Sequence, residues 1–134
     1  MSGPNPLMEN KPEYIDLALG LGYNVEIDIW YLHGQLYLGH NNPQYETTID
    51  YLKNDRFWCH CKNIDALWYL LDNEVHCFFH EEDSATLTSR GVIWTFPSKK
   101  LMPNSVCVMP EHGYSGNLDE CLGICSDYIK EYKK

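Results

Sequence analysis

One short stretch, residues 25–30 (VEIDIW), constrains the fold of this chain more than any other, because apolar and acidic residues alternate along it. Side chains on a β-strand point to opposite faces in turn, so Ile27 and Ile29 are predicted on one face and Glu26 and Asp28 on the other. Two neighbouring carboxylates repel each other, and a hard divalent cation is a natural compensating charge. The stretch therefore predicts a strand that is too apolar to be solvent-exposed and that carries a metal site on its acidic face.

A titratable group follows ten residues after this strand. Residues 35–38 are expected to form a second short strand, and Gly39 and His40 come directly after it. A histidine at that point places an acid or base beside the predicted metal. The combination is typical of hydrolytic or lyase chemistry.

Length and charge narrow the function further. The chain has 134 residues, enough for one domain spanning 1–134 with a real hydrophobic core. The net charge of −9 argues against a nucleic-acid partner, although a metal can invert the local field for a small phosphate ester. No apolar run reaches the roughly 18 residues that a membrane span needs. The charge pattern leaves the oligomeric state open.

The six cysteines are expected to be free thiols. Most lie in apolar, strand-like runs, where cysteine behaves as a small hydrophobic residue. Cys59 and Cys61 flank a single histidine, which is not the spacing of a zinc knuckle. Free thiols indicate a reducing compartment, so a cytoplasmic location is predicted.

Predicted strands alternate with helices and loops along the whole chain. This order indicates a parallel α/β sheet, either doubly wound or closed as a barrel. Polar residues recur on one face of strand after strand, which favours a compact TIM-type (β/α) barrel whose mouth collects them. The predicted strands lie near residues 23–30, 35–38, 56–62, 74–80, 86, 92–96, 105–109 and 123–125, with helices at 12–21, 47–54, after Asn63 and at 127–134.

Several of these segments together resemble the glycerophosphodiester phosphodiesterase family and, more broadly, the phospholipase-C-like phosphodiesterase barrels. The likeness covers nearly the whole chain. Its most specific element is the Glu-x-Asp strand with a Gly-His pair downstream. The segments that carry it are GPNP and ENKPEYI near the start, VEIDIW with GQLYLGHN, then WCHCKN, HEED with TLTS and GVIW, and GICSDY.

The resemblance implies a metal site and a catalytic histidine. Glu26 and Asp28 would be metal ligands, and His60 would stand where the family has a third, glutamate ligand. Mg²⁺ or Ca²⁺ is the expected cofactor, and a softer divalent metal is the alternative that the His60 imidazole would allow. His40 matches the family's catalytic histidine. Asn41 replaces the aspartate that usually follows it, which removes a charge that would hold the imidazole.

Further residues are candidates for contact with a substrate. Lys62 lies two residues after His60 on the same predicted strand face and would meet the phosphate as a point charge, in a catalytic and binding role. Glu9 has a family counterpart near the metal. The remaining candidates for lining the pocket are His80, Trp94 and Glu111.

The family usually begins with a strand ending in His-Arg-Gly, which supplies a second catalytic histidine. That strand would precede residues 2–6, so a barrel formed by this chain is expected to lack its first strand. A start assigned at the wrong codon, a truncation and a natural loss all fit this expectation.

The function these features predict is metal-dependent cleavage of a glycerophosphodiester or a related, phospholipid-derived diester. Histidines would move the protons, and the nucleophile would be either water or a hydroxyl of the substrate. The main alternative is an impaired or inactive barrel that binds a metal or a phosphorylated ligand. Another metal-dependent barrel enzyme, such as an isomerase or lyase, is the third possibility.

Overall fold

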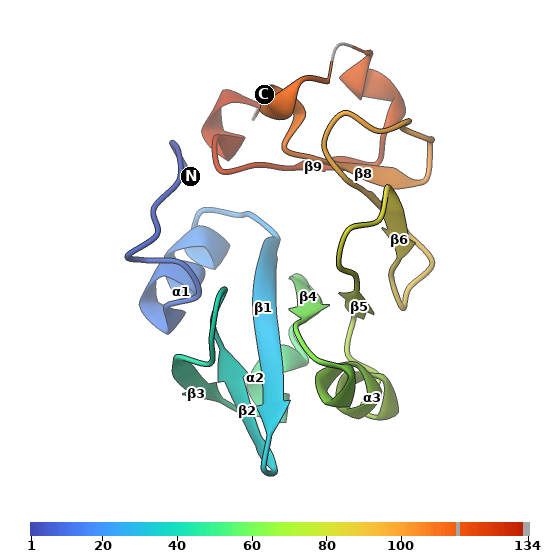
Figure 1. Ribbon diagram of the computed structural model, residues 1–134. Helices are drawn as coiled ribbons and strands as arrows, with labels where there is room; N and C mark the ends of the chain where they lie inside the picture. Colours follow the sequence, from blue (N-terminus) through green and yellow to red (C-terminus); the bar gives the residue numbers. More distant parts are fainter. Residues whose placement is uncertain (115, 133–134) are drawn as a thin grey trace. The chain divides into compact units, whose positions relative to one another are not determined.

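The computed structural model describes residues 1–114 and 116–132, which form two compact units. The N-terminal unit comprises Asn5–His80, and the C-terminal unit combines Met1–Pro4 with the chain from Glu81 onward. Each unit is built on its own β-sheet (Figure 1).

The N-terminal unit contains a five-stranded mixed sheet with the strand order β3-β2-β1-β4-β5. The strands β1, β4 and β5 run parallel to one another, whereas β2 and β3 are antiparallel to their neighbours. In chain order, the elements are α1 (Pro12–Gly20), β1 (Val25–Leu32), β2 (Gln35–Leu38), β3 (Tyr45–Thr47), α2 (Ile49–Leu52), β4 (Phe57–Cys61), α3 (Ile64–Asp72) and β5 (Cys77–Phe79).

Local sequence explains why the chain turns where it does. His33 and Gly34 both have positive φ, 50° and 77°, which is the backbone of a tight hairpin turn between β1 and β2. A two-residue turn can join only antiparallel strands. Asn63, two residues after the end of β4, caps α3 by accepting a hydrogen bond from the backbone N–H of Ala66. This cap starts the helix that carries the chain back for the parallel strand β5.

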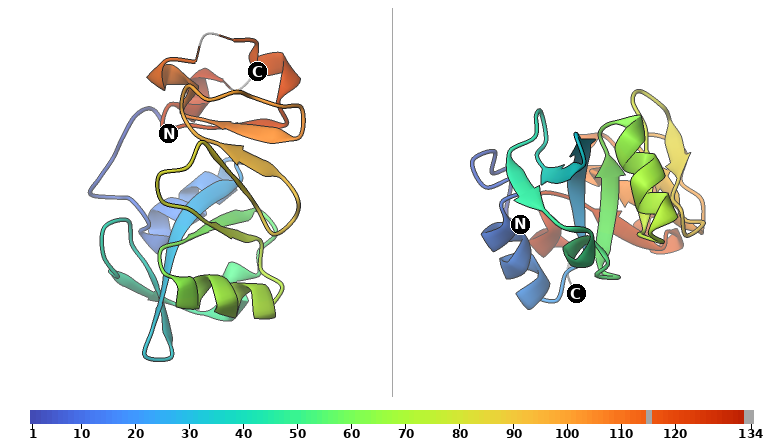
Figure 2. Two further views of the ribbon diagram at one scale, coloured as in Figure 1. Left: turned by 45° about the vertical axis from the view of Figure 1, so that its right-hand side comes forward. Right: turned by 90° about the horizontal axis from the view of Figure 1, so that it is seen from below.

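The hydrophobic core lies on one face of this sheet. Ile27 and Ile29 of β1 and Cys59 and Cys61 of β4 alternate inward, each at most 1% exposed. They pack in one cluster with residues from all three helices, so the helices cover this face: Ile15 of α1, Leu52 of α2, and Ala66 and Leu70 of α3. The right-hand view of Figure 2 shows the helices beside β1 and β4.

The C-terminal unit contains a four-stranded sheet with the order β6-β7-β8-β9. Only β6 is antiparallel to its neighbour; β7, β8 and β9 are parallel. The regular elements are β6 (Ala85–Leu87), β7 (Ile93–Thr95), β8 (Ser105–Val108) and β9 (Gly123–Cys125), with short 3₁₀ turns η1 (Pro110–His112), η2 (Leu118–Glu120) and η3 (Ile129–Glu131).

The prediction of a TIM-type barrel is wrong. The described residues form two mixed sheets of five and four strands, and neither sheet closes on itself. The connections between strands explain why no parallel barrel forms. Short turns join β1 to β2 and β6 to β7, and such turns reverse the strand direction. A pair of parallel strands needs a long crossover connection instead. Among the described residues, β8 and β9 are linked through 3₁₀ turns rather than an α-helix. Because there is no barrel, the expectation that a barrel lacks its first strand no longer applies.

Several local predictions can be compared with the structure. The strand predicted near residues 56–62 is confirmed as β4 (Phe57–Cys61), which runs parallel to β1. All six cysteines lie within the described residues, and none of them forms a disulfide. The final helix predicted at 127–134 is wrong over the described part, where only η3 forms; residues 133–134 lie outside the described residues. No helix in the described ranges is long and apolar enough to cross a membrane.

Candidate metal and catalytic site

The polar candidates gather on the face of the N-terminal sheet opposite the core. Because side chains alternate, β1 presents Glu26 and Asp28 on this face while its isoleucines enter the core. The parallel register of β1 and β4 sets Asp28 directly beside His60. The same row continues to Phe78 on β5, so neighbouring strands bring these residues together without any contribution from loops.

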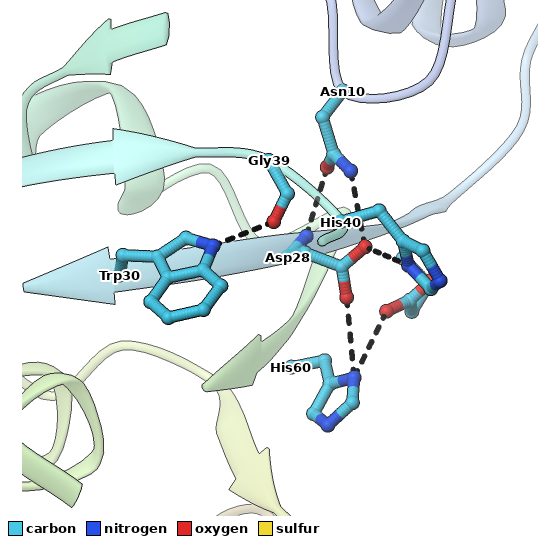
Figure 3. A network of polar contacts seen from close by, with 7 residues as sticks. Asn10, Asp28, Trp30, Gly39, His40 and His60 are labelled. Atoms are coloured by element: carbon cyan, nitrogen blue, oxygen red, sulfur yellow. Dashed lines mark hydrogen bonds and ion pairs between the residues drawn. The ribbon is translucent and has the colours of Figure 1, made fainter. Parts of the chain in front are cut away.

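Glu26, Asp28 and His60 form a group that can hold a metal ion, with one ligand atom of each lying within 4.8 Å of the others. The Nδ1 atom of His60 lies 3.1 Å from Oδ1 of Asp28 and 3.8 Å from Oε1 of Glu26. Figure 3 shows His60 pointing at the Asp28 carboxylate. Two carboxylates and one imidazole suit a borderline divalent metal such as Mn²⁺, Fe²⁺ or Zn²⁺. The residues present therefore fit the predicted metal.

The carboxylate of Asp28 is the centre of this site. It is buried, and its Oδ2 atom lies 3.0 Å from both Nδ1 of His40 and Nδ2 of Asn10. Burial alone would raise the pKa of Asp28, but the hydrogen bonds from His40, His60 and Asn10 outweigh burial. The pKa of Asp28 is therefore held well below its usual value. Asp28 stays a carboxylate at any physiological pH.

His40 is oriented by its contact with Asp28. An ionised carboxylate only accepts hydrogen bonds, so Nδ1 of His40 carries the proton in this contact and Nε2 is the nitrogen left for chemistry. The side chain is half-exposed, at 52%, so solvent and small solutes reach it. The hydrogen bond to Asp28 raises the pKa of His40, while partial burial and the Lys62 charge act to lower it. Asn41 was expected to leave the His40 imidazole without a charge to hold it. In the structure, the Asp28 carboxylate is the acidic partner of His40.

The loop that carries His40 is fixed from both sides. The indole Nε1 of Trp30 donates a 2.7 Å hydrogen bond to the Gly39 carbonyl, and the Gly39 N–H donates to the Asp28 carbonyl. Figure 3 shows Trp30 and Gly39 joined in this way. A Cβ atom at Gly39 would lie 1.9 Å from the backbone oxygen of Asn42, so only glycine fits. This close approach is the physical reason for a glycine before His40.

Two further candidates lie around this cluster in the N-terminal unit. The His80 ring stacks on the His60 ring with centroids 4.3 Å apart, and Phe78 stacks on His60 at 5.2 Å. These parallel rings limit how far the His60 imidazole can rotate. Lys62 follows β4, and its backbone N–H donates to the Ile29 carbonyl. The positive charge of Lys62 acts to lower the pKa of His40.

The remaining candidates, Trp94 and Glu111, belong to the C-terminal unit. Trp94 is buried within β7. Glu111 is exposed, and its carboxylate accepts hydrogen bonds from the Ser126 and Tyr132 hydroxyls at 2.8 Å and 3.4 Å. Their proposed contact with substrate stays a prediction.

Sequence reasoning missed the roles of Asn10 and Trp30. Asn10 lies just before the first helix, where an asparagine would be read as its cap, but Lys11 occupies the cap position and makes no side-chain cap hydrogen bond. Asn10 instead has a positive φ of 60° and contacts Asp28, 18 residues away in sequence. An asparagine before a helix is so common as a cap that sequence alone carried no signal for this long-range contact.

Comparison of the chain with protein-family models, with curated proteins and with solved structures found no match. The resemblance to the glycerophosphodiester phosphodiesterases therefore remains a hypothesis that rests on the residues quoted above.

Proposed function

We propose that this protein cleaves small phosphodiesters of the glycerophosphodiester type, with a divalent metal ion held by Glu26, Asp28 and His60 and with His40 as the acid–base group. One observation carries the proposal. The Asp28 carboxylate contacts His60 of the candidate metal group through Oδ1 and His40 through Oδ2. A metal and a proton acceptor would therefore act on the same bound molecule.

The metal would supply a positive charge that neutralises the phosphate and stabilises the charge developing in the transition state. The protein residues divide the remaining work. His40 takes the proton from the nucleophile at Nε2, because Nδ1 is engaged with Asp28. Asp28 holds that tautomer and stabilises the imidazolium once it forms. Lys62 attracts the anionic substrate toward the site as a compact charge.

The identity of the metal follows from the donor set. Carboxylates alone would favour Mg²⁺ or Ca²⁺, but His60 replaces one oxygen ligand with a nitrogen. Mn²⁺ accepts both kinds of ligand and is therefore the expected activator. Mg²⁺ and Ca²⁺ are expected to activate more weakly.

The test is the hydrolysis of bis(p-nitrophenyl) phosphate and of glycerophosphocholine by the purified chain with Mn²⁺. His40→Ala is expected to lower kcat about 10²- to 10⁴-fold, because one acid–base group is lost. His33→Ala is the matched control, since His33 is an exposed histidine of the β1–β2 turn in the same unit. EDTA is expected to abolish turnover of the wild type.

Equal rates for His40→Ala and His33→Ala would overturn the catalytic role of His40. If the wild type binds Mn²⁺ and a phosphate ester without turning any substrate over, the proposal fails. The protein would then be a binding module for phosphorylated ligands.

A further inference from the structure

Asn10 makes two hydrogen bonds to one residue, and that residue is Asp28. Its Nδ2 donates to Oδ2 of the carboxylate at 3.0 Å, and its Oδ1 accepts from the Asp28 backbone N–H at 2.9 Å. Figure 3 shows both contacts, with Asn10 approaching from the segment before α1. A side chain held at both its backbone and its carboxylate cannot easily change its rotamer.

The backbone at Asn10 is shaped for this contact. Its φ of 60° lies in the left-handed region, which asparagine adopts more readily than most residues other than glycine. The residue does not serve the helix that follows, since Lys11 occupies the cap position. The conformation and the side chain are thus both directed to Asp28 rather than to local structure.

The contact falls on the carboxylate oxygen that His40 also uses. Oδ2 accepts from both Asn10 and His40, whereas Oδ1 faces His60. Without Asn10, only the contacts with His40 and His60 restrain the terminal torsion of the Asp28 carboxylate, a torsion that is broad for aspartate. Rotation would change the direction of both oxygens at once. Asn10 therefore fixes which oxygen meets the catalytic histidine and which meets the metal group.

We propose that Asn10 is a positioning residue that sets the orientation of Asp28, and through it the tautomer of His40 and the affinity of the metal group. This inference rests on the proposed function for its catalytic consequence. Hydrogen-bond partners of ligating carboxylates typically change metal affinity about 10- to 100-fold when they are removed.

Asn10→Gly tests this role, because glycine keeps the left-handed backbone and removes both hydrogen bonds. His33→Gly is the matched control: it is also a non-glycine residue with positive φ in the same unit, and it is exposed. In metal-free protein with EDTA, ¹⁵N-edited NMR reports the tautomer of His40. The Nδ1–H form is expected to dominate in the wild type and in His33→Gly. In Asn10→Gly it should fall toward the mixture of a solvent-exposed histidine.

Calorimetric titration with Mn²⁺ is the second readout. Asn10→Gly is expected to bind Mn²⁺ about 10- to 100-fold more weakly than His33→Gly does. A merely structural role would lower the melting temperature and leave both the His40 tautomer and the affinity of the folded protein unchanged. That result would overturn the inference.

A measurement on the wild type keeps the test valid if Asn10→Gly does not fold. One Nδ2 proton of Asn10 should exchange with solvent more slowly than those of Asn24, an exposed asparagine of the same unit. Equal exchange rates would overturn the inference. If the wild type binds no Mn²⁺, the proposed function fails, but the His40 tautomer still decides whether Asn10 positions Asp28.

Discussion

The strands β1 and β4 have two faces, and an ionisable group on one face keeps its charge while one on the other face is kept neutral. Both faces belong to the same pair of strands. On one face, hydrogen bonds outweigh burial and hold the pKa of Asp28 well below its usual value. On the other, a hydrogen bond with the Cys77 thiol, together with burial, raises the pKa of the Cys61 thiol far above its usual value. Both groups are buried.

The difference shows that burial does not by itself decide the charge of a group. Asp28 has three hydrogen-bond donors around it, from Asn10, His40 and His60, so its charged form is favoured. Cys61 lies among other thiols and apolar side chains, which do not stabilise a thiolate. A strand with period-two alternation can therefore separate a charged site from a neutral core over the thickness of one sheet.

Among substitutions that leave the candidate metal ligands and His40 in place, the largest expected effect on turnover comes from Gly39. In Gly39→Ala the new Cβ would meet the Asn42 backbone oxygen, so the loop carrying His40 must move. We expect a loss of about 10²-fold in kcat, as for a misplacement of about 1 Å, and a loss of about 1–3 kcal/mol in unfolding free energy. Turnover of bis(p-nitrophenyl) phosphate and urea denaturation measure the two effects.

Gly34→Ala is the control for this substitution. Gly34 also has a positive φ, 77°, but no atom lies within 4 Å of the added Cβ. We expect only the backbone cost of about 1–2 kcal/mol and an unchanged kcat. If both variants lose turnover equally, the close contact at Gly39 does not position His40.

We expect the contribution of the core face to stability to fall at alkaline pH. The thiol of Cys61 has a raised pKa in the folded protein, so its contribution to stability is fully present below the unfolded pKa of about 8.5 and is lost as pH rises above it. From pH 8.5 to pH 10, we expect the unfolding free energy of the wild type to fall about 2 kcal/mol more than that of Cys61→Ala. Urea denaturation at both pH values measures the difference.

Parallel loss of stability in the wild type and in Cys61→Ala would show that Cys61 ionises as easily in the folded as in the unfolded chain. The contrast between the two faces would then be lost. Cys125 is a suitable second position for comparison, because it is only partly buried and lies in the C-terminal unit.

Sequence alone predicted the parts of this molecule that depend on short-range pattern. The alternation of residues 25–30 predicted the strand β1 and the separation of its acids from its core residues, and the strand β4 was predicted near residues 56–62. The cap at Asn63 marked the start of α3. These features follow from backbone geometry and local hydrogen bonding, which a few residues determine.

The parts that failed depend on contacts between distant residues. Alternating strands and helices indicated a parallel sheet, and the recurring polar residues favoured its closure as a barrel. Strand direction is instead set by the length of each connection and by the partners that a strand finds. The contact of Asn10 with Asp28 joins residues 18 positions apart, and the residue types offered no signal for it.

On α3, Trp68 has helical spacing with Ile64 and Leu71, yet all three face outward and Ala66 and Leu70 enter the core.

The central claim is that the polar face of β1 and β4 binds a divalent metal through Glu26, Asp28 and His60. The most direct test is the anomalous difference map of a crystal soaked in MnCl₂. We predict one manganese peak at about 2.0–2.6 Å from a carboxylate oxygen of Glu26, a carboxylate oxygen of Asp28 and a ring nitrogen of His60. A map with no peak at these residues, or with the two carboxylates turned toward the hydrophobic core, would contradict the account.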